Sequence, residues 1–152
     1  MFLTIDPGAD MGWSLWDGGR LADCGLGDPR TSHYGHPNLY SCVWIESQVI
    51  YPRSKARPAD ILKLAQAAGR WAGIYSALGV PARWVEPAQW KGQIPKPKRG
   101  ETYIIEKRVL EVLSPPERAV LDLGCKGLCA SKRHNVIDAV GIGLWVRKNG
   151  KS

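Results

Sequence analysis

Long apolar runs and acidic residues are both scarce in this sequence of 152 residues. No stretch approaches the roughly 20 apolar residues that a membrane-spanning helix needs. The chain also does not open with a basic segment followed by an apolar stretch, as a secretory signal does. We therefore expect a cytoplasmic protein with no membrane partner.

Closely spaced cysteines are also scarce, and this weakens the case for a structural metal. The four cysteines are Cys24, Cys42, Cys125 and Cys129. Cys125 and Cys129 have a spacing found in zinc sites, and His33 and His36 could supply a second pair of ligands. Because no second pair of cysteines is closely spaced, reduced thiols are the favoured interpretation. Whether Cys125 and Cys129 bind zinc stays open at this point.

Positive charge is in excess and is unevenly spread. Lys and Arg number 21 against 14 acids, which gives a formal charge of +7. Three basic segments contain Arg53, Lys55 and Arg57; Lys91, Lys96, Lys98, Arg99, Lys107 and Arg108; and Lys126, Lys132 and Arg133. A solvated surface would explain any one of these segments. Together they favour nucleic acid as the partner, because basic side chains that neutralise phosphates release condensed counterions.

The N-terminal half predicts four strands. Residues 2–5, 11–16 and 21–26 are rich in strand-forming residues, and the Asp-Gly-Gly sequence at 17–19 is a strong hairpin signal. Residues 27–38 are punctuated by Gly, Pro, Ser and Asn and predict a loop. A further apolar run, LYSCVWIE, ends at Glu46.

The C-terminal half predicts mainly helices. Apolar residues recur at helical spacing over 59–78, and a short strand is expected at 82–86. The remaining expectations are loops at 87–100 and 124–133 and helices at 101–113, from Pro115 after a capping-box sequence, and at 134–147. This order predicts a single α/β domain, residues 1–152, with a mixed five-stranded sheet flanked by helices.

Three acids stand out by their apolar surroundings. Asp6 and Glu46 each close an apolar strand, and Asp138 lies within a nearly all-apolar helix. A buried carboxylate needs a partner, and for any one of these acids Lys, Arg or backbone N–H groups would suffice. Almost no cation is adjacent to them in the sequence. Oxygen ligands from separate elements suit Mg²⁺, and two such ions can promote phosphodiester cleavage.

Four short motifs follow one another along the chain. They are Asp6-Pro7-Gly8 with Gly12, Trp44-Ile45-Glu46, LKLAQAAG at 62–69, and HNVIDA at 134–139. In this order they resemble the RuvC family of Holliday junction resolvases over most of the chain. The segment between the third and fourth strands lacks the usual helix, so the chain looks more like the compact phage-type enzymes. A bacterial or phage-infected cytoplasm is then the expected location.

The resemblance implies an RNase H-like fold and a nuclease that uses two Mg²⁺ or Mn²⁺ ions. Carried over by position, Asp6 would bridge both ions, and Glu46 and Asp138 would each act as a ligand. The fourth position of the family is a His or Asp three residues before the last Asp, and here it is Asn135. His134 is favoured instead, because residues four apart share a helix face and imidazole can also transfer protons; Asn135 remains the alternative.

The resemblance also implies a homodimer that nicks a four-way DNA junction symmetrically. Helix 59–78 would form the dimer interface, and Tyr51 would stack on bases at the junction centre. The expected DNA contacts are Tyr51, Arg53, Lys55, Arg57, Lys91, Lys96, Lys98, Arg99, Lys132 and Arg133. The family pattern requires neither Asp10, expected in a turn, nor Glu86, which at most borders the site. Trp90 is expected in the core.

Three other functions are compatible with parts of this pattern. A nuclease of the same fold could act on RNA or on other branched DNA. Actin-like ATPases and sugar kinases also have an Asp-x-Gly strand end, but they need two such domains, for which 152 residues are too few. A non-catalytic junction-binding protein would keep the fold without the chemistry. Metal-dependent cleavage would exclude this last class.

Overall fold

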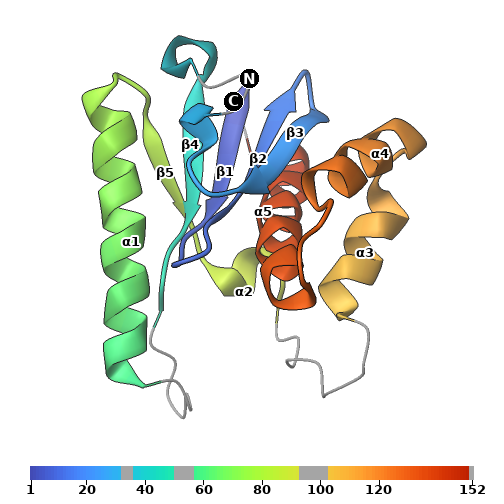
Figure 1. Ribbon diagram of the computed structural model, residues 1–152. Coiled ribbons are helices and arrows are strands. Elements are labelled where there is room, and N and C mark those ends of the chain that lie inside the picture. Colours follow the sequence, from blue (N-terminus) through green and yellow to red (C-terminus); the bar gives the residue numbers. More distant parts are fainter. Residues whose placement is uncertain (32–35, 50–56, 93–102, 151–152) are drawn as a thin grey trace.

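The computed structural model describes residues 1–31, 36–49, 57–92 and 103–150 (Figure 1). The strands are β1 (Phe2–Asp6), β2 (Gly12–Asp17), β3 (Arg20–Leu26), β4 (Cys42–Glu46) and β5 (Ala82–Val85). The helices are α1 (Pro58–Ala77), α2 (Pro87–Trp90), α3 (Ile104–Val112), α4 (Pro115–Gly124) and α5 (Ala130–Asn149). Two short 3₁₀ turns, Pro29–Thr31 and Pro37–Leu39, lie between β3 and β4.

The five strands form one mixed sheet in the order β3-β2-β1-β4-β5. β1 pairs antiparallel with β2 and parallel with β4, and β4 pairs parallel with β5. The two-residue turn between β2 and β3 has φ values of 53° at Gly18 and 78° at Gly19, the left-handed conformation that tight hairpins require. This antiparallel meander, continued by parallel strands, confirms the predicted α/β fold class with a mixed five-stranded sheet.

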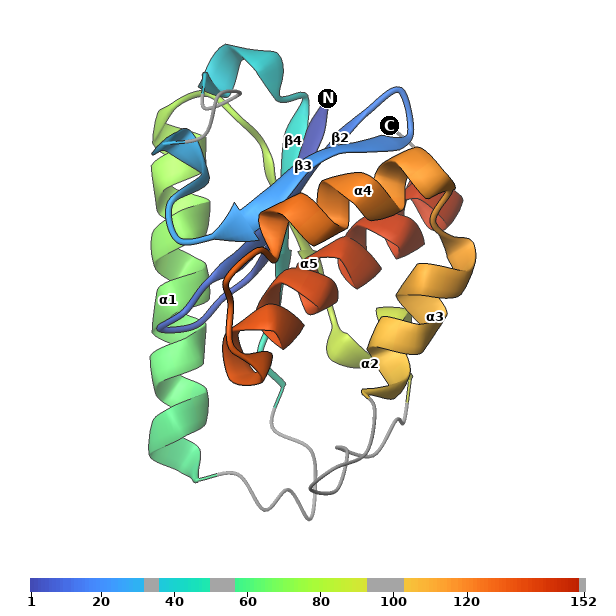
Figure 2. The ribbon, with the colours of Figure 1, turned by 45° about the vertical axis from the view of Figure 1, so that its right-hand side comes forward.

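Helices cover both faces of the sheet (Figures 1 and 2). On one face, Leu3 and Ile5 of β1 belong to the apolar cluster that includes Ala68 and Tyr75 of α1. Side chains alternate along a strand, so Phe2, Thr4 and Asp6 point to the other face, where α5 lies. Helices α3 and α4 pack around α5 on that side (Figure 2).

Helix α5 sits very close to β1 and β2. A Cβ atom at Gly12 would overlap the Asn135 carbonyl, and one at Gly143 would overlap the Trp16 indole. The hydroxyls of Thr4 and Ser14 both donate to the Ala139 carbonyl, at 2.7 and 3.0 Å. These contacts fix α5 on the sheet beside the residue that precedes Ala139, which is Asp138.

Several predicted boundaries were wrong. Helix α5 begins at Ala130 rather than at residue 134, and Lys132 and Arg133 in its first turns pair with Asp10 and Glu106. The predicted loop at 87–100 begins with helix α2, which a reciprocal Glu86–Gln89 capping box stabilises. Asp10 lies in a turn, as expected. None of the described helices is long and apolar enough to cross a membrane.

Candidate metal centre

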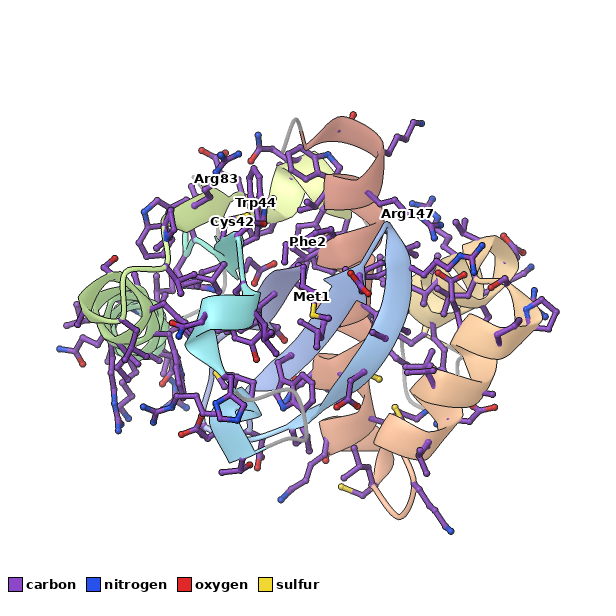
Figure 3. All side chains as sticks on the ribbon, turned by 90° about the horizontal axis from the view of Figure 1, so that it is seen from above. Met1, Phe2, Cys42, Trp44, Arg83 and Arg147 are labelled. Atoms are coloured by element: carbon purple, nitrogen blue, oxygen red, sulfur yellow. The ribbon has the colours of Figure 1, made fainter. Side chains whose placement is uncertain are left out.

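The three acids predicted from the sequence come together at one end of the sheet. Ile5 of β1 is opposite Ile45 of β4 in a parallel register, so the next residues, Asp6 and Glu46, are neighbours on the same face. The charge of Glu46 is accordingly one of the causes that raise the pKa of Asp6, after burial. Figure 3 views the molecule from the opposite end, where Phe2 and Cys42 begin these two strands. Asp138 meets the pair from α5, which crosses this face of the sheet.

Burial and mutual repulsion leave these carboxylates poorly compensated. Glu46 is 5% exposed and Asp138 is 6% exposed. Burial, followed by the charges of Glu46 and Asp138, raises the pKa of Asp6 well above its ordinary value. Burial also raises the pKa of Glu46 and of Asp138, although Lys91 acts in the opposite direction on both. The cluster therefore favours either protons or additional cations.

Neutral donors orient two of the carboxylates. Tyr103 Oη donates to Asp138 Oδ1 at 2.6 Å. Trp90 Nε1 donates to Glu46 Oε1 at 2.9 Å, and Gln48 Nε2 donates to Glu46 Oε2 at 3.3 Å. Trp90 packs against the core, as expected. Its hydrogen bond to Glu46 was not predicted, because these residues are 44 positions apart in the chain.

Lys91 is the cation that sequence reasoning did not place at this cluster. Its Nζ lies 3.7 Å from Glu46 Oε1 and 3.5 Å from Asp138 Oδ2. Burial by itself lowers the pKa of Lys91, but the Glu46 and Asp138 carboxylates outweigh it and raise that pKa. Helix α2 brings Lys91 there. Glu86 is exposed and serves as the N-terminal cap of α2.

The two candidates for the fourth position have different surroundings. His134 lies one turn before Asp138 on α5, and its ring is 5.9 Å from that of Tyr103, centroid to centroid. Its charge lowers the pKa of Asp138, so the two groups interact. Asn135 instead donates from Nδ2 to the Asp10 carbonyl at 2.7 Å. This hydrogen bond joins the start of α5 to the turn that contains Asp10, so the Asn135 amide has a structural partner.

The carboxylate oxygens of the acidic cluster are the kind of ligand that a hard divalent cation prefers. Asp6, Glu46 and Asp138 supply oxygen donors, and their combined negative charge exceeds the single positive charge of Lys91. In their present positions, the described residues contain no group of three or more His, Cys, Asp or Glu side chains that could hold a metal ion. Cys125 and Cys129, the pair with zinc-like spacing, are among these described residues; Cys125 is buried and Cys129 is exposed. His33 lies outside the described residues.

The expected DNA contacts are only partly placed. Tyr51, Arg53, Lys55, Lys96, Lys98 and Arg99 lie outside the described residues. Arg57 is exposed just before α1. Lys132 pairs with Asp10 at 3.2 Å, and Arg133 pairs with Glu106 at 2.9 Å. Lys91 and Tyr103, which both contact Asp138, flank segment 93–102 and its basic residues.

Comparison with solved structures finds similar folds. A Thermus thermophilus RuvC in complex with a Holliday junction substrate is 16% identical, with a TM-score of 0.49, over 95% of this chain and 92% of that one. A second T. thermophilus RuvC structure is 18% identical, with a TM-score of 0.47, over 98% and 96%. No family model and no curated protein matches the sequence. The function therefore has to be inferred from the chain's own site.

Proposed function

We propose that this chain is a divalent-metal-dependent endonuclease that resolves four-way DNA junctions by paired, symmetric nicks. The observation that carries the proposal is the meeting of Asp6, Glu46 and Asp138, from β1, β4 and α5, in one negatively charged cluster. Glu46 and Asp138 are buried there and Asp6 is half-buried. Burial of several carboxylates close together is costly in folding free energy. Such a cluster therefore indicates a cation or a function that needs the charges.

Asp6, Glu46 and Asp138 would hold two Mg²⁺ or Mn²⁺ ions, with His134 as the fourth ligand. Such ions supply a nucleophile at neutral pH and stabilise the attacking and leaving oxygens of a phosphodiester. Trp90 and Tyr103 fix the orientation of Glu46 and Asp138 through hydrogen bonds. This arrangement of donors around carboxylate ligands is typical of metal sites, where outer hydrogen bonds orient the ligands.

The basic segments would hold the duplex arms through their phosphates, which position DNA without reading its sequence. Segment 93–102 is the strongest candidate, because both of its flanking contacts, Lys91 and Tyr103, are at the acidic cluster. Tyr51, in the segment that follows β4, would stack on the bases at the junction centre. Arg57, just before α1, would contact DNA phosphates beside this segment.

A homodimer through α1 would place two active sites on a nearly two-fold symmetric substrate. Leu62, Gln66, Gly69 and Gly73 are all exposed and follow one stripe of the helix. A Cβ atom at Gly69 or Gly73 would meet nothing within 4 Å, so a second helix could approach closely there. Ala68 is buried and faces the sheet instead.

The proposal is tested with an immobile four-way junction labelled on each strand in turn. We expect paired symmetric nicks by the wild type in Mg²⁺ or Mn²⁺, and no nicks in EDTA or with Asp6→Asn. His134→Ala should lose cleavage, whereas Asn135→Ala should keep most of it. Junction binding without cleavage in either metal would contradict catalysis and identify a binding protein. Equal cleavage of RNA or of flaps would contradict the junction specificity.

A further inference from the structure

The cluster of three carboxylates contains an internal cation, and this feature goes beyond the function proposed above. Lys91 Nζ lies within 3.7 Å of both Glu46 and Asp138, at a side-chain exposure of 28%. The same ammonium lies over the Trp90 ring, 4.9 Å from its centroid. Lys91 is thus an ordered part of the cluster, with a route to solvent.

A divalent ion at Glu46 Oε1 and Asp138 Oδ2 would compete with the Lys91 ammonium for the same two oxygens. An ion about 2.1 Å from Glu46 Oε1 and Asp138 Oδ2 would lie within about 6 Å of the present Nζ position. A divalent ion would also repel the ammonium at that separation and would draw on the charge of the same two carboxylates. Metal entry would therefore weaken both ion pairs of Lys91 and favour movement of its ammonium.

The local structure allows this movement. Lys91 is the C-terminal cap of α2, and Gly92 follows it with a φ of 66°, a conformation that favours glycine. The lysine side chain is flexible and its ammonium is readily hydrated. The neutral donors of the cluster, Trp90 and Tyr103, would keep Glu46 and Asp138 oriented after the ammonium leaves.

We propose that Lys91 is the resident counter-ion of the metal-free site and that metal binding is an exchange of cations. The inference rests on the proposed metal-dependent function. Lys91 stabilises the acid cluster before metal arrives, and a divalent ion displaces its ammonium. The released ammonium is then available to a substrate phosphate, which is the contact predicted for Lys91 from the sequence. Metal affinity is lowered by the competing lysine.

The test compares the wild type with Lys91→Met, which keeps an unbranched side chain only one atom shorter and removes the charge. Exposed Lys126, in the turn between α4 and α5, supplies the matched control Lys126→Met. Mn²⁺ binding without DNA is measured by electron paramagnetic resonance of the free ion, and thermal unfolding is followed in EDTA and in Mn²⁺. Should Lys91→Met fail to fold, Lys91→Gln replaces it.

Lys91→Met should lower the melting temperature in EDTA and bind Mn²⁺ about tenfold more tightly than the wild type. Lys126→Met should change neither property. Mn²⁺ affinity that is equal or weaker in Lys91→Met, with Mn²⁺ still bound by the wild type, would overturn the cation exchange and leave the nuclease proposal intact. Absence of Mn²⁺ binding and of junction cleavage in the wild type would overturn both.

A second measurement uses the wild type alone. Nuclear magnetic resonance of ¹³C-labelled lysine side chains, assigned with Lys91→Met, reports the surroundings of each ammonium. Addition of Mg²⁺ should shift the Lys91 signal toward that of a hydrated lysine and leave the Lys126 signal in place. An unchanged Lys91 signal at Mg²⁺ saturation would overturn the proposal.

Discussion

Asp6 shows at the scale of one residue how a candidate function conflicts with stability. The residue ends a strand whose apolar side chains, Leu3 and Ile5, are fully buried. Burial first, and then the charge of Glu46 at the same edge of the sheet, raise the pKa of its carboxyl group. A residue selected only for folding at this position would be neutral. The proposed metal-dependent function would explain the charge, because a carboxylate at this position could hold a cation.

Replacement of Asp6 by Asn should therefore stabilise the metal-free protein while abolishing cleavage. We expect a gain of about 1–2 kcal/mol in the free energy of unfolding at pH 7 in EDTA. The gain should vanish below about pH 4, where the aspartate is protonated in the folded and the unfolded states alike. Thermal unfolding across this pH range, with the exposed Asp122→Asn as control, measures it. A destabilised Asp6→Asn would show that the carboxylate has a structural partner.

At the scale of the elements, Glu117 joins three of them. Its carboxylate accepts hydrogen bonds from Ser114, which caps α4, and from the Leu21 backbone N–H of β3 at 3.1 Å. It also pairs with Arg147 of α5 at 3.0 Å. Arg147, labelled in Figure 3, extends this contact over the Trp16 ring. One buried acid thus ties the outer helix to the sheet and to α5.

This network predicts a defined pH dependence. Burial alone raises the pKa of Glu117, but the hydrogen bonds from Ser114 and Leu21 and the charge of Arg147 outweigh it and lower that pKa. A lowered pKa in the folded state means that the contribution is complete above the ordinary value of 4.5 and is lost as the pH falls through the folded value.

Glu117→Gln should accordingly cost about 1–3 kcal/mol at pH 7, because Arg147 loses its charged partner. The difference from the wild type should shrink as the pH falls below 4.5, the ordinary pKa of the side chain. Urea unfolding at several pH values tests this, with the exposed Glu111→Gln as the matched control. A difference that is independent of pH would show that the charge of Glu117 is irrelevant.

At the scale of the whole molecule, the exposed stripe of α1 is the surface proposed for dimerisation. Leu62 on this stripe is 59% exposed, and Leu123 on α4 is 72% exposed. Both are apolar side chains on helices, but only Leu62 neighbours the glycines that permit close helix approach. The two residues therefore form a matched pair for a test of assembly.

Leu62→Glu should convert the dimer to a monomer, whereas Leu123→Glu should leave the dimer unchanged. The buried charge and the lost apolar contact at a helix interface should raise the dimer dissociation constant at least about tenfold. Sedimentation velocity over a range of concentrations measures this. Identical behaviour of both variants and the wild type would place any dimer interface elsewhere.

Much of the site could be predicted because the signals are local. Asp6 and Glu46 each end an apolar strand, and Asp138 interrupts an apolar helix, so each is conspicuous within a few residues of sequence. The hairpin at Gly18 and Gly19 and the Ser114–Glu117 cap are equally local. Helix α2 was missed because its proline- and lysine-rich surroundings are typical of a loop.

The sequence by itself determined the strands, the hairpin and the identity of the acids, because alternation, turn chemistry and burial are encoded over short stretches of chain. Only the tertiary structure decided which groups meet those acids. Tyr103 is 35 positions from Asp138, and Lys91 is 47 positions from it. Contacts over such separations depend on how α2, α3 and α5 pack together. No local pattern specifies that packing.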